Sequence, residues 1–368
     1  MMNGFPHVDP IPLPAPIWLF KVLHIVTLAL HFVAMQILVG SLLIAVLLNL
    51  LGGSQAARTA ATAISRRLTI VMTYVINLGV PPLLFAQVLY GRAIYTSSVM
   101  IGARWIAVVP ALMLAYWLLY RFAAGVEAGK KVWWIGLSAW IVIGAIAHVY
   151  STNMTLMLRP EVWPSMYSAS SLGTHLPTGD PTTIPRFVFM LVSGFVAAGL
   201  WMVYLGGRKT FSAADGKFLA GLGGRIATVA AIVQVVAAMA VYRSQPAIVQ
   251  AGLNSHLLYK VAGLGWLALT AVVLLFAAFA AFAKPVGAVV SWAAVLVGAL
   301  PIVLMTLYRD GIRDLTLLSK GYDVWDRVVV TNWSVVGIFL VVFVAGLVVV
   351  GWLISVVARA TRVMESAA

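Results

Sequence analysis

Long apolar runs separated by short polar segments make up most of the chain. Nine of these runs have about 20 or more residues each, and none alternates apolar and polar positions with a period of two. Backbone amides find no water in the bilayer core, so spanning segments must be helices or a closed barrel, and the missing alternation favours helices. The sequence therefore predicts nine transmembrane helices, near residues 17–50, 68–91, 101–121, 132–158, 187–206, 225–243, 257–283, 287–308 and 332–358.

Composition agrees with this pattern. Of the 368 residues, 62% are hydrophobic and 9% are charged, and the mean hydropathy is +1.02. A water-soluble globule would need far more polar surface. We therefore predict an all-α polytopic membrane protein that forms one transmembrane domain over residues 1–368, with loop caps on the outer side near 159–186 and 309–331. The first apolar run is too long for a signal-peptide core, so we expect it to be retained as a span.

Basic residues beside the spans predict the orientation. The pairs Arg66-Arg67, Lys130-Lys131 and Arg208-Lys209 fall on one side when the N-terminus is outside, and basic residues beside spans tend to remain cytoplasmic. The expected topology is thus N-out and C-in, in a bacterial inner membrane. The net charge of +14 then indicates contact with the anionic lipid surface. No soluble basic module is present to bind nucleic acid.

The reactive side chains available at membrane depth are few. The chain has no cysteine, which excludes disulfides, thiolate iron-sulfur ligation and covalent c-type haem attachment within it. No Asp or Glu falls inside the nine predicted spans, and proton-coupled transporters usually need a buried carboxylate. This pattern therefore disfavours a transporter and leaves histidines as the titratable groups.

Three histidines lie within predicted spans. His24 and His31 are seven residues apart on the first span and share one face, because seven residues make nearly two turns. Interfacial Trp residues place His148 of the fourth span level with His24. Two imidazoles at equal depth on antiparallel helices suit axial ligation of a b-type haem, with His31 serving a deeper one. The alternative is that each imidazole bonds only to a hydroxyl or a backbone carbonyl.

The order of several motifs resembles subunit I of the cytochrome bd quinol oxidases over most of the chain. The matching positions are His31-Phe32, Gly40, Leu78-Gly79-Val80, Gln87, Gly91, Asn153, Met157, Pro160, Arg186-Phe187, Ser193-Gly194-Phe195, Gly207-Arg208 and Gly263-Leu264-Gly265. The resemblance implies that His31 ligates a haem of the active site. It also implies nine spans with the N-terminus outside.

Departures from that family change the expected function. Val188 and Val261 stand where the family has the ligands of its low-spin haem, and Leu307 stands near its carboxylate ligand. The family's proton-path glutamates align near Val108 and Tyr116. The segment that corresponds to the long quinol loop shrinks to 242–257, where Gln245-Pro246 is similar to a fragment of it. A complete oxygen-reducing site is therefore not expected.

The leading hypothesis is a subunit of a respiratory electron-transfer complex that holds one or two b-type haems on His24, His31 and His148. Electrons would pass between membrane quinone and an outer partner such as a c-type cytochrome on another chain. Arg104, Arg243 and Lys260, near outer ends of spans, could pair with haem propionates or simply reach the interface. The alternatives are a haem-free anchoring subunit of such a complex and, third, a divergent bd-type terminal oxidase.

Overall fold

The computed structural model describes residues 4–6, 11–282 and 286–366 of the chain. Over these residues it is almost entirely helical, and nine helices are long and apolar enough to cross a membrane, as predicted. The long helices are α1 (Ile17–Leu51), α2 (Gln55–Met100), α3 (Gly102–Glu127), α4 (Trp133–Leu156), α6 (Thr183–Gly206), α7 (Ala213–Arg243), α9 (Leu257–Phe282), α10 (Ala288–Ser319) and α11 (Trp333–Ser366). The short ones are the 3-10 turn η1 (Pro160–Val162), α5 (Trp163–Ala169) and α8 (Ala247–Ser255).

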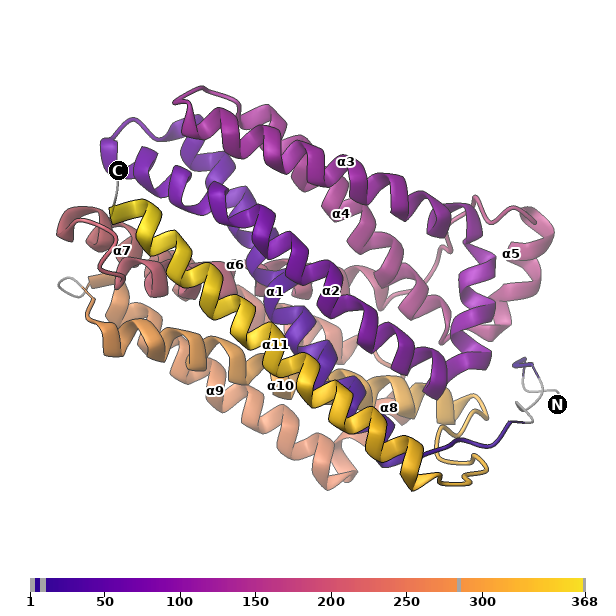
Figure 1. Ribbon diagram of the computed structural model, residues 1–368. Helices are drawn as coiled ribbons and strands as arrows, with labels where there is room; N and C mark the ends of the chain where they lie inside the picture. The colour runs from indigo at the N-terminus through magenta and orange to yellow at the C-terminus, as the bar shows by residue number, and fades with distance from the viewer. Residues whose placement is uncertain (1–3, 7–10, 283–285, 367–368) are drawn as a thin grey trace.

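The long helices run roughly parallel to one another and alternate in direction, so their connections gather at two ends (Figure 1). One end carries α5, α8 and the irregular segment 320–332, and is called the loop-rich end below. The other carries the short turns 52–54, 128–132 and 207–212, and is called the basic end. At the loop-rich end, Leu13 pairs in parallel with Val329, and this pairing places the start of α1 beside the start of α11.

Helix α1 lies at the centre of the bundle and packs against α2, α4, α6 and α10. It approaches α6 closely at Gly40, where an added Cβ would lie 2.1 Å from the Gly194 carbonyl oxygen. Small residues let membrane helices approach in this way. Helix α11 lies on the outside of the bundle and exposes most of its apolar side chains, which fits contact with lipid.

The predicted spans agree with the helices except at some ends. Residue 283, where the seventh predicted span ends, lies outside the described residues. Helix α2 begins thirteen residues before the predicted span at 68 and passes through Pro81 and Pro82. Helix α10 continues to Ser319, so 309–319 is helical and is not part of a loop cap. Within the other expected cap, 159–186, η1 and α5 form and α6 already begins at Thr183.

Candidate functional site

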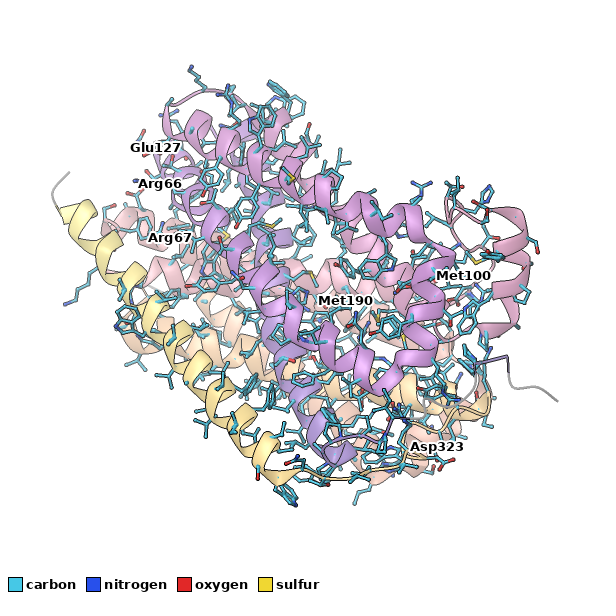
Figure 2. The ribbon with its side chains drawn as sticks, turned by 45° about the vertical axis from the view of Figure 1, so that its right-hand side comes forward. Arg66, Arg67, Met100, Glu127, Met190 and Asp323 are labelled. Atoms are coloured by element: carbon cyan, nitrogen blue, oxygen red, sulfur yellow. The ribbon has the colours of Figure 1, made fainter. Side chains whose placement is uncertain are left out.

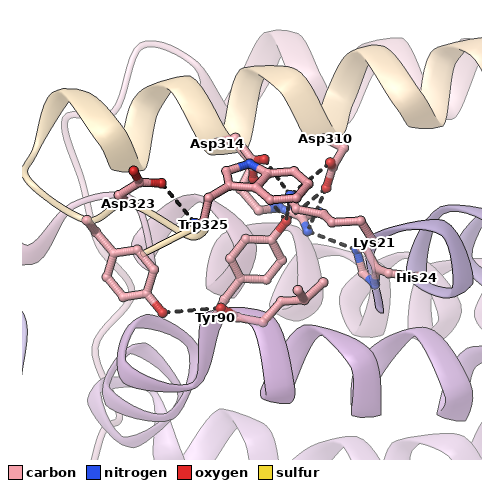
Figure 3. A network of polar contacts seen from close by, with 10 residues as sticks. Lys21, His24, Tyr90, Asp310, Asp314, Asp323 and Trp325 are labelled. Carbon is pink, nitrogen blue, oxygen red and sulfur yellow. Dashed lines mark hydrogen bonds and ion pairs between the residues drawn. The ribbon is translucent and has the colours of Figure 1, made fainter. Parts of the chain in front are cut away.

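The extension of α10 carries two aspartates into the bundle interior near the loop-rich end. Asp310 and Asp314 are one turn apart, so their carboxylates lie on one face of the helix. They meet Lys21 in the second turn of α1, and the exposed fractions of Lys21, Asp310 and Asp314 are 5%, 4% and 8%. Lys21 Nζ lies 3.0 Å from Asp310 Oδ2 and also donates to the Asp314 carboxylate (Figure 3). One ammonium thus binds both carboxylates.

Tyr90 of α2 completes this contact from the opposite side. The helix departs from helical geometry at Tyr90, with φ −122° and ψ 23°, and the side chain is fully buried. The hydroxyl accepts a hydrogen bond from Lys21 Nζ at 2.7 Å. It lies 2.9 Å from Asp310 Oδ1 and 3.1 Å from Asp314 Oδ1, so it can donate to either carboxylate. Lys21, Tyr90, Asp310 and Asp314 therefore form one connected set, supplied by three helices.

Two further residues join the set: His24, one turn after Lys21 on α1, and Arg313, which lies between the two aspartates on α10. The His24 Nδ1 atom lies 3.0 Å from the carbonyl oxygen of Pro82, an acceptor, so Nδ1 carries the hydrogen and Nε2 is the acceptor. Arg313 Nη1 donates to that Nε2 at 2.9 Å and lies 3.7 Å from Asp310 Oδ1. The guanidinium also stands over the Tyr90 ring, 4.7 Å from its centroid. We call these six residues, Lys21, His24, Tyr90, Asp310, Arg313 and Asp314, the buried network.

The balance of charge explains how this network tolerates burial. Two carboxylates face one ammonium and one guanidinium, so the network is neutral when His24 is neutral. Ions are costly to remove from water, and good geometry with additional hydrogen bonds offsets much of that cost. An apolar cluster of similar volume would avoid this desolvation cost altogether. Ionisable groups buried inside an apolar helix bundle therefore make this network the candidate functional site.

The other histidines predicted as haem ligands lie apart from the buried network. His31 Nδ1 lies 3.0 Å from the Val75 carbonyl oxygen, and its ring packs on Gly79, where an added Cβ would lie 3.0 Å from ring atoms. His148 lies beside the ring of Phe187, with ring centroids 5.6 Å apart. Among the described residues no contact joins His148 to His24 or His31, and no group of three His, Asp or Glu side chains could hold a metal ion.

The two histidines of α1 offer different coordination chemistry. A metal-bound imidazole usually donates its second ring N–H to a carbonyl, which leaves the other nitrogen for the metal. His31 fits that arrangement, because Val75 accepts from Nδ1 and no hydrogen bond to Nε2 is seen within the described part of the chain. His24 does not, because Pro82 and Arg313 engage both of its nitrogens.

The three basic residues predicted to meet haem propionates are exposed. Arg104 lies in the first turn of α3 and donates through Nε to the Thr174 carbonyl oxygen at 3.1 Å. Arg243 ends α7, and Lys260 lies in the first turn of α9. All three lie toward the loop-rich end, and none contacts His24, His31 or His148 in the described structure. Their placement fits interfacial side chains.

The expectation that no Asp or Glu lies inside a span was wrong. Four of the six residues 309–314 are charged. Such a stretch resembles a solvated loop as long as the partners of its charged side chains are unknown. Lys21, the partner of both aspartates, lies 289 residues from Asp310 along the chain. The spacing of Asp310 and Asp314, together with a lysine inside the first apolar run, was the available signal.

Comparison with known protein families finds no family that matches this chain, and comparison with curated proteins finds no matching relative. The resemblance to cytochrome bd subunit I therefore remains a prediction. The buried network and the histidines are the features of the described structure that bear on function.

Proposed function

We propose that the chain transfers charge across a lipid bilayer, and that the buried network is where it takes up and releases a proton. The observation that carries this proposal is the mutual contact of two carboxylates, an ammonium, a guanidinium, an imidazole and a phenol inside an apolar bundle. Residues of this kind within membrane spans mark proton relays and ion pathways.

The geometry around Lys21 supports proton exchange. Because Lys21 binds both carboxylates, a proton added to Asp314 leaves Asp310 paired with Lys21 and close to Arg313. Tyr90 lies within hydrogen-bond distance of both carboxylates and of the ammonium. Proton transfer needs donor and acceptor within such distances. The network can therefore change its protonation without losing its internal contacts.

Further buried polar residues of α1 continue from the network toward the basic end. Gln36 and Ser41 are 1% and 0% exposed, and Gln36 Nε2 and Ser41 Oγ have no hydrogen-bond partner among the described protein atoms. Buried polar atoms usually have a partner, and solvent can supply it. Gln36 borders a cavity with room for about one water, whose polar lining includes Ser193, Gln234 and Thr270. Lys21 and Ser41 lie about 30 Å apart along α1.

Proton flux into liposomes tests the proposal. The purified chain would be reconstituted, a potassium diffusion potential imposed, and internal pH followed with an enclosed dye. Asp314→Asn and Gln36→Leu should each lower the proton flux at least about tenfold. This is a lower bound, because a positioned proton-transfer group usually contributes about 10²–10⁴-fold to the rate. Glu161→Gln is the matched control, because Glu161 is exposed outside the bundle. Equal flux through the native chain and Asp314→Asn would overturn the proposal.

Electron transfer through b-type haem is the second candidate, favoured by the arrangement of His31. His31 would hold the iron through Nε2 while Val75 fixes the ring, and the haem would supply reversible one-electron chemistry. Membrane quinone, other subunits of a respiratory complex and an outer c-type cytochrome remain the partners proposed for this function. The bacterial inner membrane remains the proposed location.

Reduced-minus-oxidised spectra of the purified chain test the second candidate. A b-type α-band should be present in the native protein, be lost in His31→Leu and persist in His175→Leu, a variant of an exposed loop histidine. A native spectrum without that band would contradict haem binding. A haem-free anchoring subunit would show neither the band nor the proton flux.

A further inference from the structure

A hollow at the basic end is lined by segments far apart in the sequence. It lies among the end of α1, the first turns of α2, the end of α3 with the turn that follows it, and the connection from α6 to α7. Figure 2 shows Arg66, Arg67 and Glu127 together at this end, far from Met100 and Asp323 at the loop-rich end. The hollow is therefore separate from the buried network.

Basic side chains outnumber acidic ones around the hollow. Its basic members are Arg58, Arg66, Arg67, Lys130 and Lys131, and its acidic members are Glu127 and Asp215. Arg66 lies 3.5 Å from Glu127, but both side chains are about half exposed, so this pair is weak.

Neutral carbonyl groups hold two of the basic side chains in place. Lys131 Nζ donates to the Leu50 carbonyl oxygen at 2.7 Å, and Arg58 Nη1 donates to that of Gly53 at 2.9 Å. These contacts position the two cations without neutralising them. An excess of positive charge therefore faces the hollow.

The hollow lies at the level expected for lipid headgroups. Lys130 and Lys131 are separated by one residue from Trp133 and Trp134 at the start of α4, and Trp134 is 57% exposed. Exposed Trp residues at the end of a span mark the boundary between hydrocarbon and water. Leu48, Val126 and Phe211 add apolar lining to the basic one. A ligand with an anionic head and an apolar body matches both parts.

We propose that this hollow binds the phosphate headgroup of an anionic phospholipid. The positive charge selects phosphate, and the apolar lining at the interface selects a lipid over free phosphate. Basic pockets between spans on the cytoplasmic side are the form that such lipid sites take. The site does not depend on the function proposed above.

Native mass spectrometry and a thermal-shift titration of the full chain in detergent test the site. The probes are cardiolipin, phosphatidylcholine and inorganic phosphate. The test variant is Arg66→Gln/Lys130→Gln/Lys131→Gln. The control variant, Arg104→Gln/Arg243→Gln/Lys260→Gln, loses the same charge at the loop-rich end.

Cardiolipin should bind the native chain and the control variant alike. Its affinity for the test variant should fall on the order of 100-fold, because each basic residue near an anionic lipid contributes about fivefold. The unliganded test variant should melt at the native temperature, since its substitutions are on exposed or partly exposed side chains. Equal affinity for phosphatidylcholine, an equal loss in the control variant, or displacement of cardiolipin by millimolar phosphate would each overturn the proposal.

Discussion

Replacing Lys21 with methionine removes the ammonium that both aspartates of α10 share. Met keeps most of the volume of the side chain, so the chief effect is electrostatic. Asp310 still has Arg313 at 3.7 Å, whereas the Tyr90 hydroxyl is the polar contact that remains to Asp314 within the described residues. Removing one partner of a buried ion pair leaves an uncompensated charge and costs about 3–5 kcal/mol. We expect Lys21→Met to lose that much free energy of unfolding.

Adding Asp314→Asn to Lys21→Met removes the charge left without a partner. The double variant should therefore be more stable than the sum of the two single effects predicts. Residues in one hydrogen-bonded network show coupling of about 0.5–3 kcal/mol, and we expect the upper part of that range because both side chains are buried.

Equilibrium unfolding in mixed micelles of the native chain, the two single variants and the double variant measures the coupling. The Lys320–Glu161 pair supplies the control, with Nζ and Oε2 2.7 Å apart but with side chains 31% and 53% exposed. Lys320→Met should cost less than about 1 kcal/mol. Additive effects of Lys21→Met and Asp314→Asn would contradict the predicted coupling, because they would mean that the two groups do not interact.

Two further predictions concern helix packing and the loop-rich end. Gly40→Ala should destabilise the protein by about 1–3 kcal/mol, because the added Cβ would lie 2.1 Å from the Gly194 carbonyl oxygen. Gly144→Ala is the control and should leave the stability unchanged, because no described atom outside its own helix lies within 4 Å of the added Cβ. Equal melting temperatures of the two variants would contradict the predicted clash. Burial raises the pKa of Tyr322, which lies outside the spans, above its ordinary value of 10.0. Folding thus favours the neutral phenol, and its stabilising effect is complete below pH 10 and is lost as pH rises through the folded pKa. Melting curves from pH 9 to 11 should show a smaller alkaline loss in Tyr322→Phe, and an unchanged loss would count against this assignment.

Much of the fold was accessible from the pattern of apolar residues. The nine spans follow from uninterrupted apolar runs, since lipid requires each spanning segment to satisfy its own backbone hydrogen bonds. The start of α1 at Ile17 and the end of α7 at Arg243 agree with the prediction. Helix ends were less predictable where polar residues continue the helix. The first turns of α2 are polar and extend beyond the apolar run, because Ser54 caps them and accepts from the Ala57 amide.

The candidate site was only partly predictable. His24 was expected at depth and is 2% exposed there, but its partners come from α2 and α10, which the sequence does not place beside α1. Asp310 was assigned to a loop because the predicted apolar span ends at residue 308, and its partner Lys21 becomes apparent only once the helices are packed. The lysine inside the first apolar run and the spacing of the two aspartates indicate buried charge, but neither shows which helices pack together.

The proposed function requires a change of protonation inside the bundle, and infrared difference spectroscopy between two pH values observes such a change directly. The native chain should show a band from a protonated carboxylic acid in a water-poor environment that appears on acidification. This band should shift in Asp310→Asn and be lost in Asp314→Asn, while Glu161→Gln should leave it unchanged. A native chain in which no buried carboxylate changes protonation over the pH range where it stays folded would contradict proton uptake by the buried network.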